Sequence, residues 1–363
     1  MNKVLRTTIT LPVIIVVIAL VGVLAYSQRV TLAEKIMAKG LRTRMAADAL
    51  AELPDGLHLT LCGAGGPMPA PKASGPCVAV IAGDQFFVVD AGTDGVRNLN
   101  RMGYQAGAIN AVLLTHFHSD HIDGLGEMAM GRWVGKANSS PLPVYGPVGV
   151  TQVVDGFNTA YSQDAIYRHD HHGDAVAPLS GAGMIAKPFQ QPADGELTIV
   201  YEKDGLIIEA LAVAHDPIKP AVAYRFTYKG RSLLISGDTL KSANIEHFSQ
   251  GIDLLVHEGL APNLLKMMNV AATEVGNPVL AKISHDVQDY HTSPVEAAEI
   301  ARDARVGHLL YYHVVPPIIF SGQETLWLNG AEDVFEDYTV GVDGVTFSMP
   351  AGSDEVLKIR DGL

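Results

Sequence analysis

The sequence has few cysteines and comparatively few basic side chains. Its two cysteines, Cys62 and Cys77, are too few for a disulfide framework. They either form one bridge, if the protein is exported, or stay as small buried apolar residues. Lysine and arginine number 26 against 39 aspartates and glutamates, giving a net charge of −13. No basic stripe is visible, so a surface built to hold nucleic acid is disfavoured.

Repeats of fixed period, low-complexity tracts and a second linker are also missing from the sequence. The length of 363 residues therefore fits one large α/β domain or two ordinary ones. Apolar residues make up 48%, which is ample for a packed core, and 36 glycines with 20 prolines predict many tight turns.

An apolar run is present at the N-terminus. Lys3 and Arg6 precede an uncharged stretch from Leu11 to Tyr26, which fits a signal peptide or a membrane anchor. The run is slightly short of the ~20 residues of a spanning helix. Val23-Leu24-Ala25 offers a cleavage site, whereas a basic flank hinders export. That flank contains Arg29, Lys35, Lys39, Arg42 and Arg44.

The orientation of an anchor follows from two opposed arguments. Lysine and arginine counts alone favour a cytoplasmic C-terminal flank. An anchor with its N-terminus inside and an exported domain is the commoner arrangement, and we prefer it. A buried helix of a soluble protein is the third interpretation. The predicted organisation is a signal peptide or anchor over 1–26, a membrane-proximal helical linker over 27–56 and a catalytic domain over 57–363.

Strands and helices alternate through the catalytic domain, after a linker helix predicted at Thr31–Leu53 and ended by Pro54-Asp55-Gly56. Strands are predicted at His58–Cys62, Cys77–Ile81, Gln85–Asp90, Ala111–Thr115, Leu197–Tyr201, Leu206–Val213, Ala221–Tyr228, Ser232–Ser236, Leu254–His257 and Leu309–His313. Helices are predicted at Val96–Met102, Val150–Tyr167, Leu260–Val275 and Pro294–Ala304, the last begun by a capping box of Ser293 and Glu296. This order favours an α/β (α+β) fold with helices outside two sheets, although periodicity alone allows other α/β layouts.

The strongest chemical signal is the segment Thr115-His116-Phe117-His118-Ser119-Asp120-His121-Ile122-Asp123-Gly124. It follows the apolar strand Ala111–Leu114, at a strand end where loops build sites. Three histidines and an aspartate within six residues supply imidazole and carboxylate ligands, which suit Zn²⁺ and related ions. His116 and His118 alternate in an extended segment, so both can point to one side. A metal site is therefore predicted here.

The pattern His-x-His-x-Asp-His resembles that of the metallo-β-lactamase superfamily. Asp90-Ala91-Gly92, after the apolar Phe86–Val89, resembles the earlier Asp-x-Gly strand end of that superfamily. The resemblance covers roughly residues 57 to 350. It implies an αββα sandwich, hydrolysis, and two divalent metal ions between the sheets, with zinc as the expected metal.

The resemblance also extends to more distant ligands, each at a strand end. His215 precedes Ala223-Tyr224-Arg225, where Gly-Tyr-Arg is usual in ribonuclease Z; Asp238 resembles the bridging aspartate, and His313 matches the last histidine. The implied ligands of the first metal are His116, His118, His215 and Asp238. Those of the second metal are Asp120, His121, Asp238 and His313.

Three further stretches resemble the ribonuclease Z and arylsulfatase-like branch. They are the glycine-rich Leu61–Pro67, the turn Gly146-Pro147-Val148-Gly149, and the pairs His257-Glu258 and His291-Thr292-Ser293. The expected catalytic residues are Asp120 as a proton acceptor, His291 as the general acid and Glu258 as its orienting carboxylate. His291 could instead serve only to lead into the helix capped at Ser293.

The expected reaction is cleavage of a phosphodiester or sulfate ester by a metal-bound hydroxide. Arg168, His171 and His172 belong to a second histidine cluster, which lines the substrate cleft or is a solvated loop. Alternatives are a lactam or lactone hydrolase and an iron-containing redox protein. A small anionic ester is the expected substrate, RNA is disfavoured by charge, the N-terminal helix would contact the membrane, and a homodimer is compatible with the fold.

Overall fold

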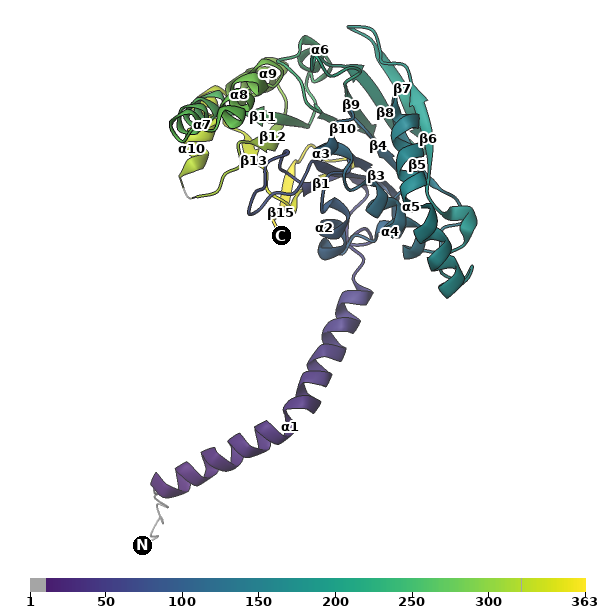
Figure 1. Ribbon diagram of the computed structural model, residues 1–363, viewed down its shortest axis with the longest axis vertical. Helices are drawn as coiled ribbons and strands as arrows, with labels where there is room; N and C mark the ends of the chain where they lie inside the picture. The colour runs from purple at the N-terminus through teal and green to yellow at the C-terminus, as the bar shows by residue number, and fades with distance from the viewer. Residues whose placement is uncertain (1–10, 321) are drawn as a thin grey trace. The chain divides into compact units, whose positions relative to one another are not determined.

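The computed structural model describes residues 11–320 and 322–363, so Lys3 and Arg6 lie outside the described residues. The chain divides after Asp48 into two units. The first contains one helix, α1 (Leu11–Ala46) (Figure 1). Among the described residues, no single helix has the length and hydropathy to cross a membrane. The segments Ile14–Val23 and Ala25–Ala46 reach that length and hydropathy only when they are taken together, and they are bent by 45° relative to each other.

Helix α1 differs from the predicted linker helix at both ends. The prediction began a separate helix at Thr31, but the structure has one helix from Leu11. The predicted end at Leu53 is also wrong, because the helix stops at Ala46. In the second unit, the Ala49 amide donates to the Gly103 carbonyl at 3.2 Å, and Leu50 and Leu53 pack against a buried apolar cluster. Burial of these leucines favours turns over further helix.

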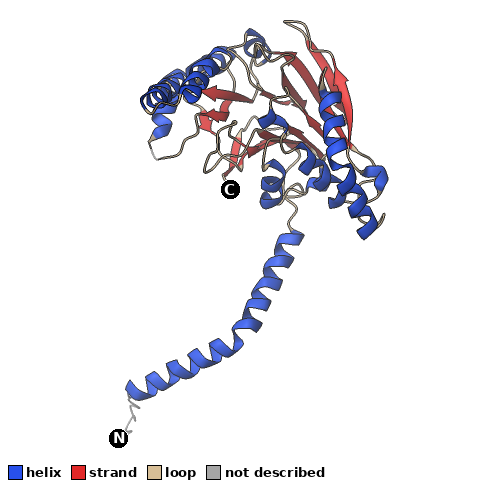
Figure 2. Cartoon of the chain, viewed as in Figure 1, coloured by secondary structure: helices blue, strands red, loops and turns tan. Residues whose placement is uncertain are grey.

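The second unit contains two sheets packed face to face (Figures 1 and 2). The first sheet has eight strands in the order β15-β14-β1-β2-β3-β4-β5-β6. Their bounds are β1 (Gly56–Gly63), β2 (Cys77–Ala82), β3 (Gln85–Val89), β4 (Ala111–Leu113), β5 (Leu142–Pro147), β6 (Met184–Phe189), β14 (Val345–Pro350) and β15 (Leu357–Asp361).

The second sheet has seven strands in the order β13-β12-β11-β10-β9-β8-β7. Their bounds are β7 (Leu197–Lys203), β8 (Leu206–Ala212), β9 (Val222–Tyr228), β10 (Arg231–Ile235), β11 (Leu254–Leu260), β12 (His308–Val315) and β13 (Tyr338–Val340). Strands β3 to β6 are parallel to one another, and so are β10 to β13. Each sheet therefore gathers several carboxyl ends at one edge, where loops can form a site.

Helices cover the outer faces of the two sheets (Figure 2). The helices of the second unit are α2 (Gly95–Met102), α3 (Ser119–Ile122), α4 (Leu125–Gly135), α5 (Val150–His172), α6 (Ala243–Phe248), α7 (Pro262–Glu274), α8 (Pro278–Asp286), α9 (Pro294–Ala304), α10 (Gln323–Leu328) and α11 (Ala331–Val334). Of these, α3 lies at a strand end rather than on an outer face, and α8 packs on α7. Leu99 of α2 and Met128 of α4 are buried against the first sheet, and Ala301 of α9 against the second. A third apolar cluster fills the space between the sheets, with Phe87 and Phe226 among its members. The predicted αββα sandwich is confirmed.

The predicted elements are present with shifted ends. Predicted strand Ala111–Thr115 stops at Leu113, and predicted helix Val150–Tyr167 continues to His172. Helix Pro294–Ala304 has the predicted bounds, and its capping box of Ser293 and Glu296 is present. Strands β5, β6, β13, β14 and β15 had not been predicted.

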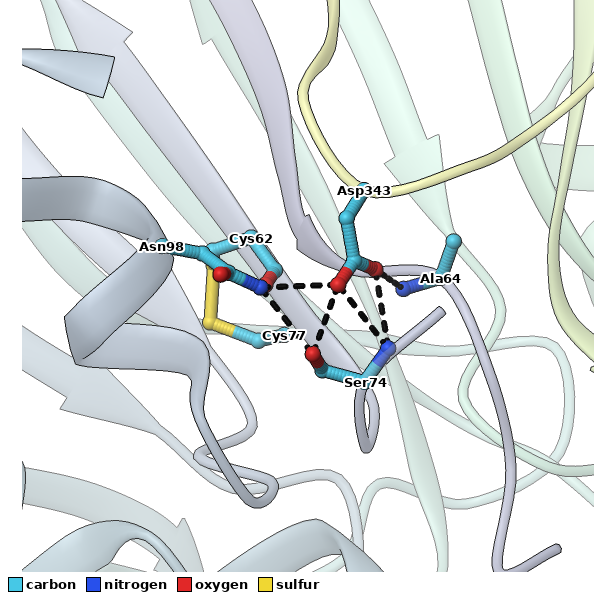
Figure 3. Close-up of a disulfide and its surroundings, with 6 residues drawn as sticks. All are labelled: Cys62, Ala64, Ser74, Cys77, Asn98 and Asp343. Carbon is cyan, nitrogen blue, oxygen red and sulfur yellow. Dashed lines mark hydrogen bonds between the residues drawn. A yellow bond between two sulfur atoms is a disulfide. The ribbon is translucent and has the colours of Figure 1, made fainter. Parts of the chain in front are cut away.

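Cys62 and Cys77 form a disulfide, with their Cα atoms 5.0 Å apart (Figure 3). Both side chains are fully buried. Cys62 lies near the end of β1 and Cys77 begins β2, and these strands are antiparallel neighbours in the sheet. The bridge therefore closes the loop between the two strands. The sequence allowed either a disulfide or two buried thiols, and the structure contains the disulfide.

Candidate metal centre

The segment after β4 is fixed by the strand end before it. Asp90, which follows β3, has φ of 57° and turns its carboxylate toward the neighbouring strand end. Its two oxygens accept hydrogen bonds from the backbone amide and the hydroxyl of Thr115, each at 2.8 Å. This holds His116 and His118 in extended backbone. The short helix α3 then places Asp120 and His121.

The other candidate ligands come from the second sheet. His215 lies between β8 and β9, and Asp238 follows β10. His313 lies in β12 with φ of 48°, where the register between β11 and β12 shifts after Glu258. A bulge of this kind redirects a side chain out of the normal strand alternation, and such backbone is concentrated at functional sites.

Asp238 lies at the centre of the cluster. Its Oδ2 is 3.3 Å from His121 Nε2 and 3.4 Å from His313 Nε2. The same oxygen is 3.8 Å from Nε2 of both His116 and His215. The chain thus brings imidazoles from both sheets around one buried carboxylate. Asp120 joins them from the rim, with its Oδ2 3.4 Å from His313 Nε2.

The remaining ring nitrogens are held by neighbouring groups. His121 Nδ1 donates to Asp90 at 2.8 Å, and His215 Nδ1 donates to the Tyr290 carbonyl at 2.9 Å. His116 Nδ1 is 3.0 Å from the Thr115 hydroxyl. Each of these bonds leaves Nε2 to face the cluster. Histidine ligands of metals are usually oriented in this way by a second partner on the other nitrogen.

The buried polar atoms of the cluster fit metal ions. Four side-chain atoms are buried and make no hydrogen bond, although burial of an unpaired polar atom is costly. They are His116 Nε2, His121 Nε2, Asp238 Oδ1 and His313 Nδ1. Candidate donors fall into sets whose atoms lie within 4.8 Å of one another. The sets are His116, His118, His215 and Asp238; Asp120, His121 and His313; and Asp238, His291 and His313. Nitrogen and carboxylate donors of this kind suit Zn²⁺.

The electrostatics of the cluster favour the neutral imidazole at three histidines and an ionised carboxylate at Asp238. Burial lowers the pKa of His116, His118 and His215, so each tends to lose its proton and expose a lone pair. Burial also opposes charge on Asp238, but His313 and His121 outweigh it and hold the pKa of that carboxyl well below its usual range. His121 differs: burial lowers its pKa, but Asp238 and Asp90 outweigh burial and raise that pKa well above its usual range. Neutral His116, His118 and His215 and an ionised Asp238 are in the protonation states that metal ligands require, and His121 would have to lose its proton on binding an ion.

A histidine–carboxylate pair lies beside the cluster. His291 Nδ1 donates to Glu258 Oε1 at 2.9 Å. The same oxygen accepts the amides of Thr239 and Thr292, each at 3.1 Å, and Glu258 is fully buried. Burial lowers the pKa of His291, but the charge and hydrogen bond of Glu258 dominate and raise it to about 9. The predicted neighbours His291 and Glu258 are therefore together in the structure.

Two orienting groups had no role in the sequence prediction. The sequence marks Asp90 only as a strand end, yet its carboxylate accepts a hydrogen bond from His121 and orients that ring. The Tyr290 carbonyl orients His215, and no sequence signal identifies a backbone acceptor. Arg168 pairs with Asp164 at 2.7 Å within α5. Over the described residues, neither Arg168 nor the two histidines of the second cluster, His171 and His172, joins a candidate metal set. Their substrate-binding role stays a prediction.

Comparison with known proteins agrees with this geometry. The family model described as "Beta-lactamase superfamily domain" matches residues 86–314. Ribonuclease Z of Mycolicibacterium paratuberculosis (strain ATCC BAA-968 / K-10) is 33% identical over 273 residues, covering 75% of this chain and 90% of that protein. The chain belongs to the metallo-β-lactamase superfamily, in its ribonuclease Z-like branch.

Solved structures of the metallo-β-lactamase fold are similar to this one. Human tRNase Z, short form, has a TM-score of 0.57 at 19% identity, covering 81% of this chain and 99% of that chain. The metallo-β-lactamase fold protein YhfI from Bacillus subtilis also has a TM-score of 0.57, at 21% identity, covering 81% of this chain and 100% of that chain. At these identities the likeness supports the fold.

Proposed function

We propose that this metallo-β-lactamase-fold hydrolase cleaves a phosphodiester bond in a small anionic ester, using two metal ions. The observation that carries the proposal is the convergence of seven donor side chains, six of them gathered around Asp238. A solvated polar cluster has no reason to bury unpaired ring nitrogens. The seven residues are His116, His118, Asp120, His121, His215, Asp238 and His313.

The donor set fits two divalent ions, with zinc the first candidate. One ion would be held by His116, His118, His215 and Asp238. The other would be held by Asp120, His121, Asp238 and His313. Ions bound there lower the pKa of a water and neutralise charge on the ester oxygens.

The protein side chains supply the proton transfers. Asp120, whose side chain is 14% exposed at the rim, accepts a proton from the attacking water. His291, 8% exposed, donates a proton to the leaving oxygen. Glu258 holds His291 through Nδ1, so Nε2 is left for the substrate.

A small ester suits the surroundings of the site better than a large RNA. Helix α5 contains one lysine or arginine, Arg168, and that side chain pairs with Asp164. The chain as a whole has a net charge of −13. Tight binding of a long phosphate backbone normally requires contacts from several lysine or arginine side chains. Relatives named ribonuclease Z support phosphodiester chemistry, and RNA is therefore one arm of the test.

The test is an assay of metal-analysed protein on four substrates: bis-p-nitrophenyl phosphate, p-nitrophenyl sulfate, a lactam and precursor tRNA. We expect the phosphodiester to be hydrolysed fastest. A chelator should remove the activity, and added Zn²⁺ should restore it. Preference for the sulfate, the lactam or precursor tRNA would replace the proposal with an arylsulfatase, a lactamase or an RNA-processing enzyme, respectively.

We also propose that the N-terminal segment is a signal or anchor and that the catalytic domain lies in an oxidising compartment. The Cys62–Cys77 disulfide supports this, because reducing compartments keep such cysteines as thiols. The apolar part of α1 supports it as well. A C-terminal fusion of full-length protein to alkaline phosphatase should be active in a bacterial host. A fluorescent cytoplasmic GFP fusion with an inactive phosphatase fusion would contradict the proposal.

A further inference from the structure

The segment of residues 63–76, which runs from the last residue of β1 to the residue before β2, borders the candidate metal centre; we name it the opening loop. A Cβ added to Gly66 would lie 2.9 Å from His313 Cε1, so the loop backbone lies directly against that ring. A Cβ added to Gly75 would lie 3.1 Å from the Asp120 carbonyl. The Val314 amide donates to the Ala64 carbonyl at 3.1 Å. The loop therefore touches two of the candidate ligands.

The opening loop also forms one wall of a groove whose lining includes Val314, the residue that follows His313 in β12. The groove has a volume of about 440 Å³. Its lining includes Ala70, Pro71 and Lys72 of the loop on one side. Val314 and Phe320 line it from the other. The groove is mostly apolar, and its lining includes one cation, Lys72, and one anion, Glu324. It therefore suits the apolar part of an ester.

A single carboxylate holds the two ends of the opening loop (Figure 3). Asp343 accepts the amide of Ala64 at 2.9 Å and the amide and hydroxyl of Ser74 at 2.9 and 2.6 Å. It also accepts Asn98 Nδ2 at 2.7 Å. The residue is 8% exposed, and all four partners are donors. Because the donors are shared between Oδ1 and Oδ2, both oxygens of the Asp343 side chain must act as acceptors.

The disulfide lies next to this network. It joins the residues that flank the opening loop, Cys62 and Cys77. Asn98 connects the two features, because its Nδ2 also donates to the Cys62 carbonyl at 2.8 Å. The opening loop is therefore held by a covalent link, the disulfide, and by hydrogen bonds to the buried Asp343 carboxylate.

We propose that Asp343 is a positioning residue which, together with the Cys62–Cys77 disulfide, holds the opening loop against the metal centre as a wall of the substrate site. The proposal rests on the hydrolytic function proposed above. Reduction of the bridge by a dithiol would loosen this wall. In that exchange the dithiol gives two electrons and two protons, becomes a disulfide itself, and leaves thiols at Cys62 and Cys77.

The first test is Asp343→Asn, which keeps the shape but places an NH₂ group among donors. We expect peptides of residues 63–76 to exchange amide hydrogens faster. We also expect KM for bis-p-nitrophenyl phosphate to rise about tenfold, since a charged hydrogen-bond acceptor is lost from a buried site. Metal content and kcat should stay close to wild type. The matched control is Asp354→Asn, because that carboxylate is fully exposed.

The second test is Cys62→Ala with Cys77→Ala, compared with wild type before and after dithiothreitol. The double variant and reduced wild type should show the same faster exchange in residues 63–76 and the same raised KM. Dithiothreitol should change nothing further in the double variant. Because a dithiol can bind zinc, metal content is measured in each sample.

Unchanged loop exchange in both Asp343→Asn and the double cysteine variant would overturn the proposal, as would faster exchange with an unchanged KM. Loss of metal in both variants would also overturn it, because the loop would then support the ligands rather than the substrate. A wild-type protein that hydrolyses none of the four substrates contradicts the proposed function. Amide hydrogen exchange in residues 63–76 can be measured on an inactive protein. It therefore distinguishes failure of the loop proposal from failure of the proposed function.

Discussion

Replacing Asp238 by asparagine is expected to remove at least one metal ion per chain and to lower hydrolysis about 10²–10⁴-fold, from the several kcal/mol that bound metals supply. One carboxylate oxygen of Asp238 lies within 3.8 Å of four imidazoles, and the other is buried without a partner. An amide offers one oxygen acceptor, so it cannot serve two ions as a carboxylate can. Metal content by elemental analysis and kcat/KM on bis-p-nitrophenyl phosphate measure the effect.

The matched control for this variant is Asp216→Asn. Asp216 follows His215 in the chain, but its side chain is 60% exposed and pairs with Lys219. Its substitution should leave the metal content unchanged. Full metal occupancy in Asp238→Asn would contradict the proposed role of Asp238 as a metal ligand. Equal loss in both variants would point to a general weakening of the fold.

The second large effect is expected for His291→Ala, which should lower kcat about 10²–10⁴-fold, the usual contribution of a general acid. The metal content should not change, because seven other side chains provide the donors. His291 Nδ1 donates a hydrogen bond to Glu258 Oε1 at 2.9 Å, and His291 also lies with Asp238 and His313 in one set of candidate metal donors. Both kcat and metal content must therefore be measured on the same sample.

A partner variant separates the role of the pair from that of the fold. Glu258→Gln should lower kcat, but it should add little in the double variant with His291→Ala, because both changes remove one catalytic unit. His285→Ala is the control, since His285 is an exposed histidine on α8. Metal loss in His291→Ala would make His291 a ligand. Additive losses in the double variant would show that Glu258 acts elsewhere.

The candidate metal centre could be predicted from the sequence because its candidate ligands follow buried strands, and the structure brings these side chains together. The apolar segment before His116 predicts a strand, and the polar residues after it then lie at the strand end. His215, Asp238 and His313 could be assigned through family resemblance, because no spacing rule brings such distant residues together. In the structure these residues meet because the two sheets pack face to face. The orienting role of Asp90 depends on φ of 57° at that residue, which residue type alone does not specify.

The unpredicted strands depend on long-range pairing or contain unfavourable residues. β14 pairs with β1, which lies nearly 300 residues earlier in the chain, so its local sequence contains little of the reason for its conformation. β5 contains Pro143 and Pro147, residues that normally argue against a strand within a sheet. Pairing with β4 and β6 outweighs that local preference. Tertiary contacts decide such short elements.

The disulfide could not be decided from the two cysteines alone. Cys62 and Cys77 meet because β1 and β2 are antiparallel and Gly63 pairs with Cys77. A change of register by one residue would turn one side chain to the other face of the sheet. The pairing therefore follows from the strand register, which is known only once both strands are placed.

The division of the donors between the two sheets has a consequence for folding. His116, His118, Asp120 and His121 are contributed by the β4 side, and the others by the β8, β10 and β12 ends. A chain that has assembled one sheet offers an incomplete set of ligands. Tight uptake of the proposed ions would therefore require the sandwich to close, and an ion held by both halves would in turn oppose their separation.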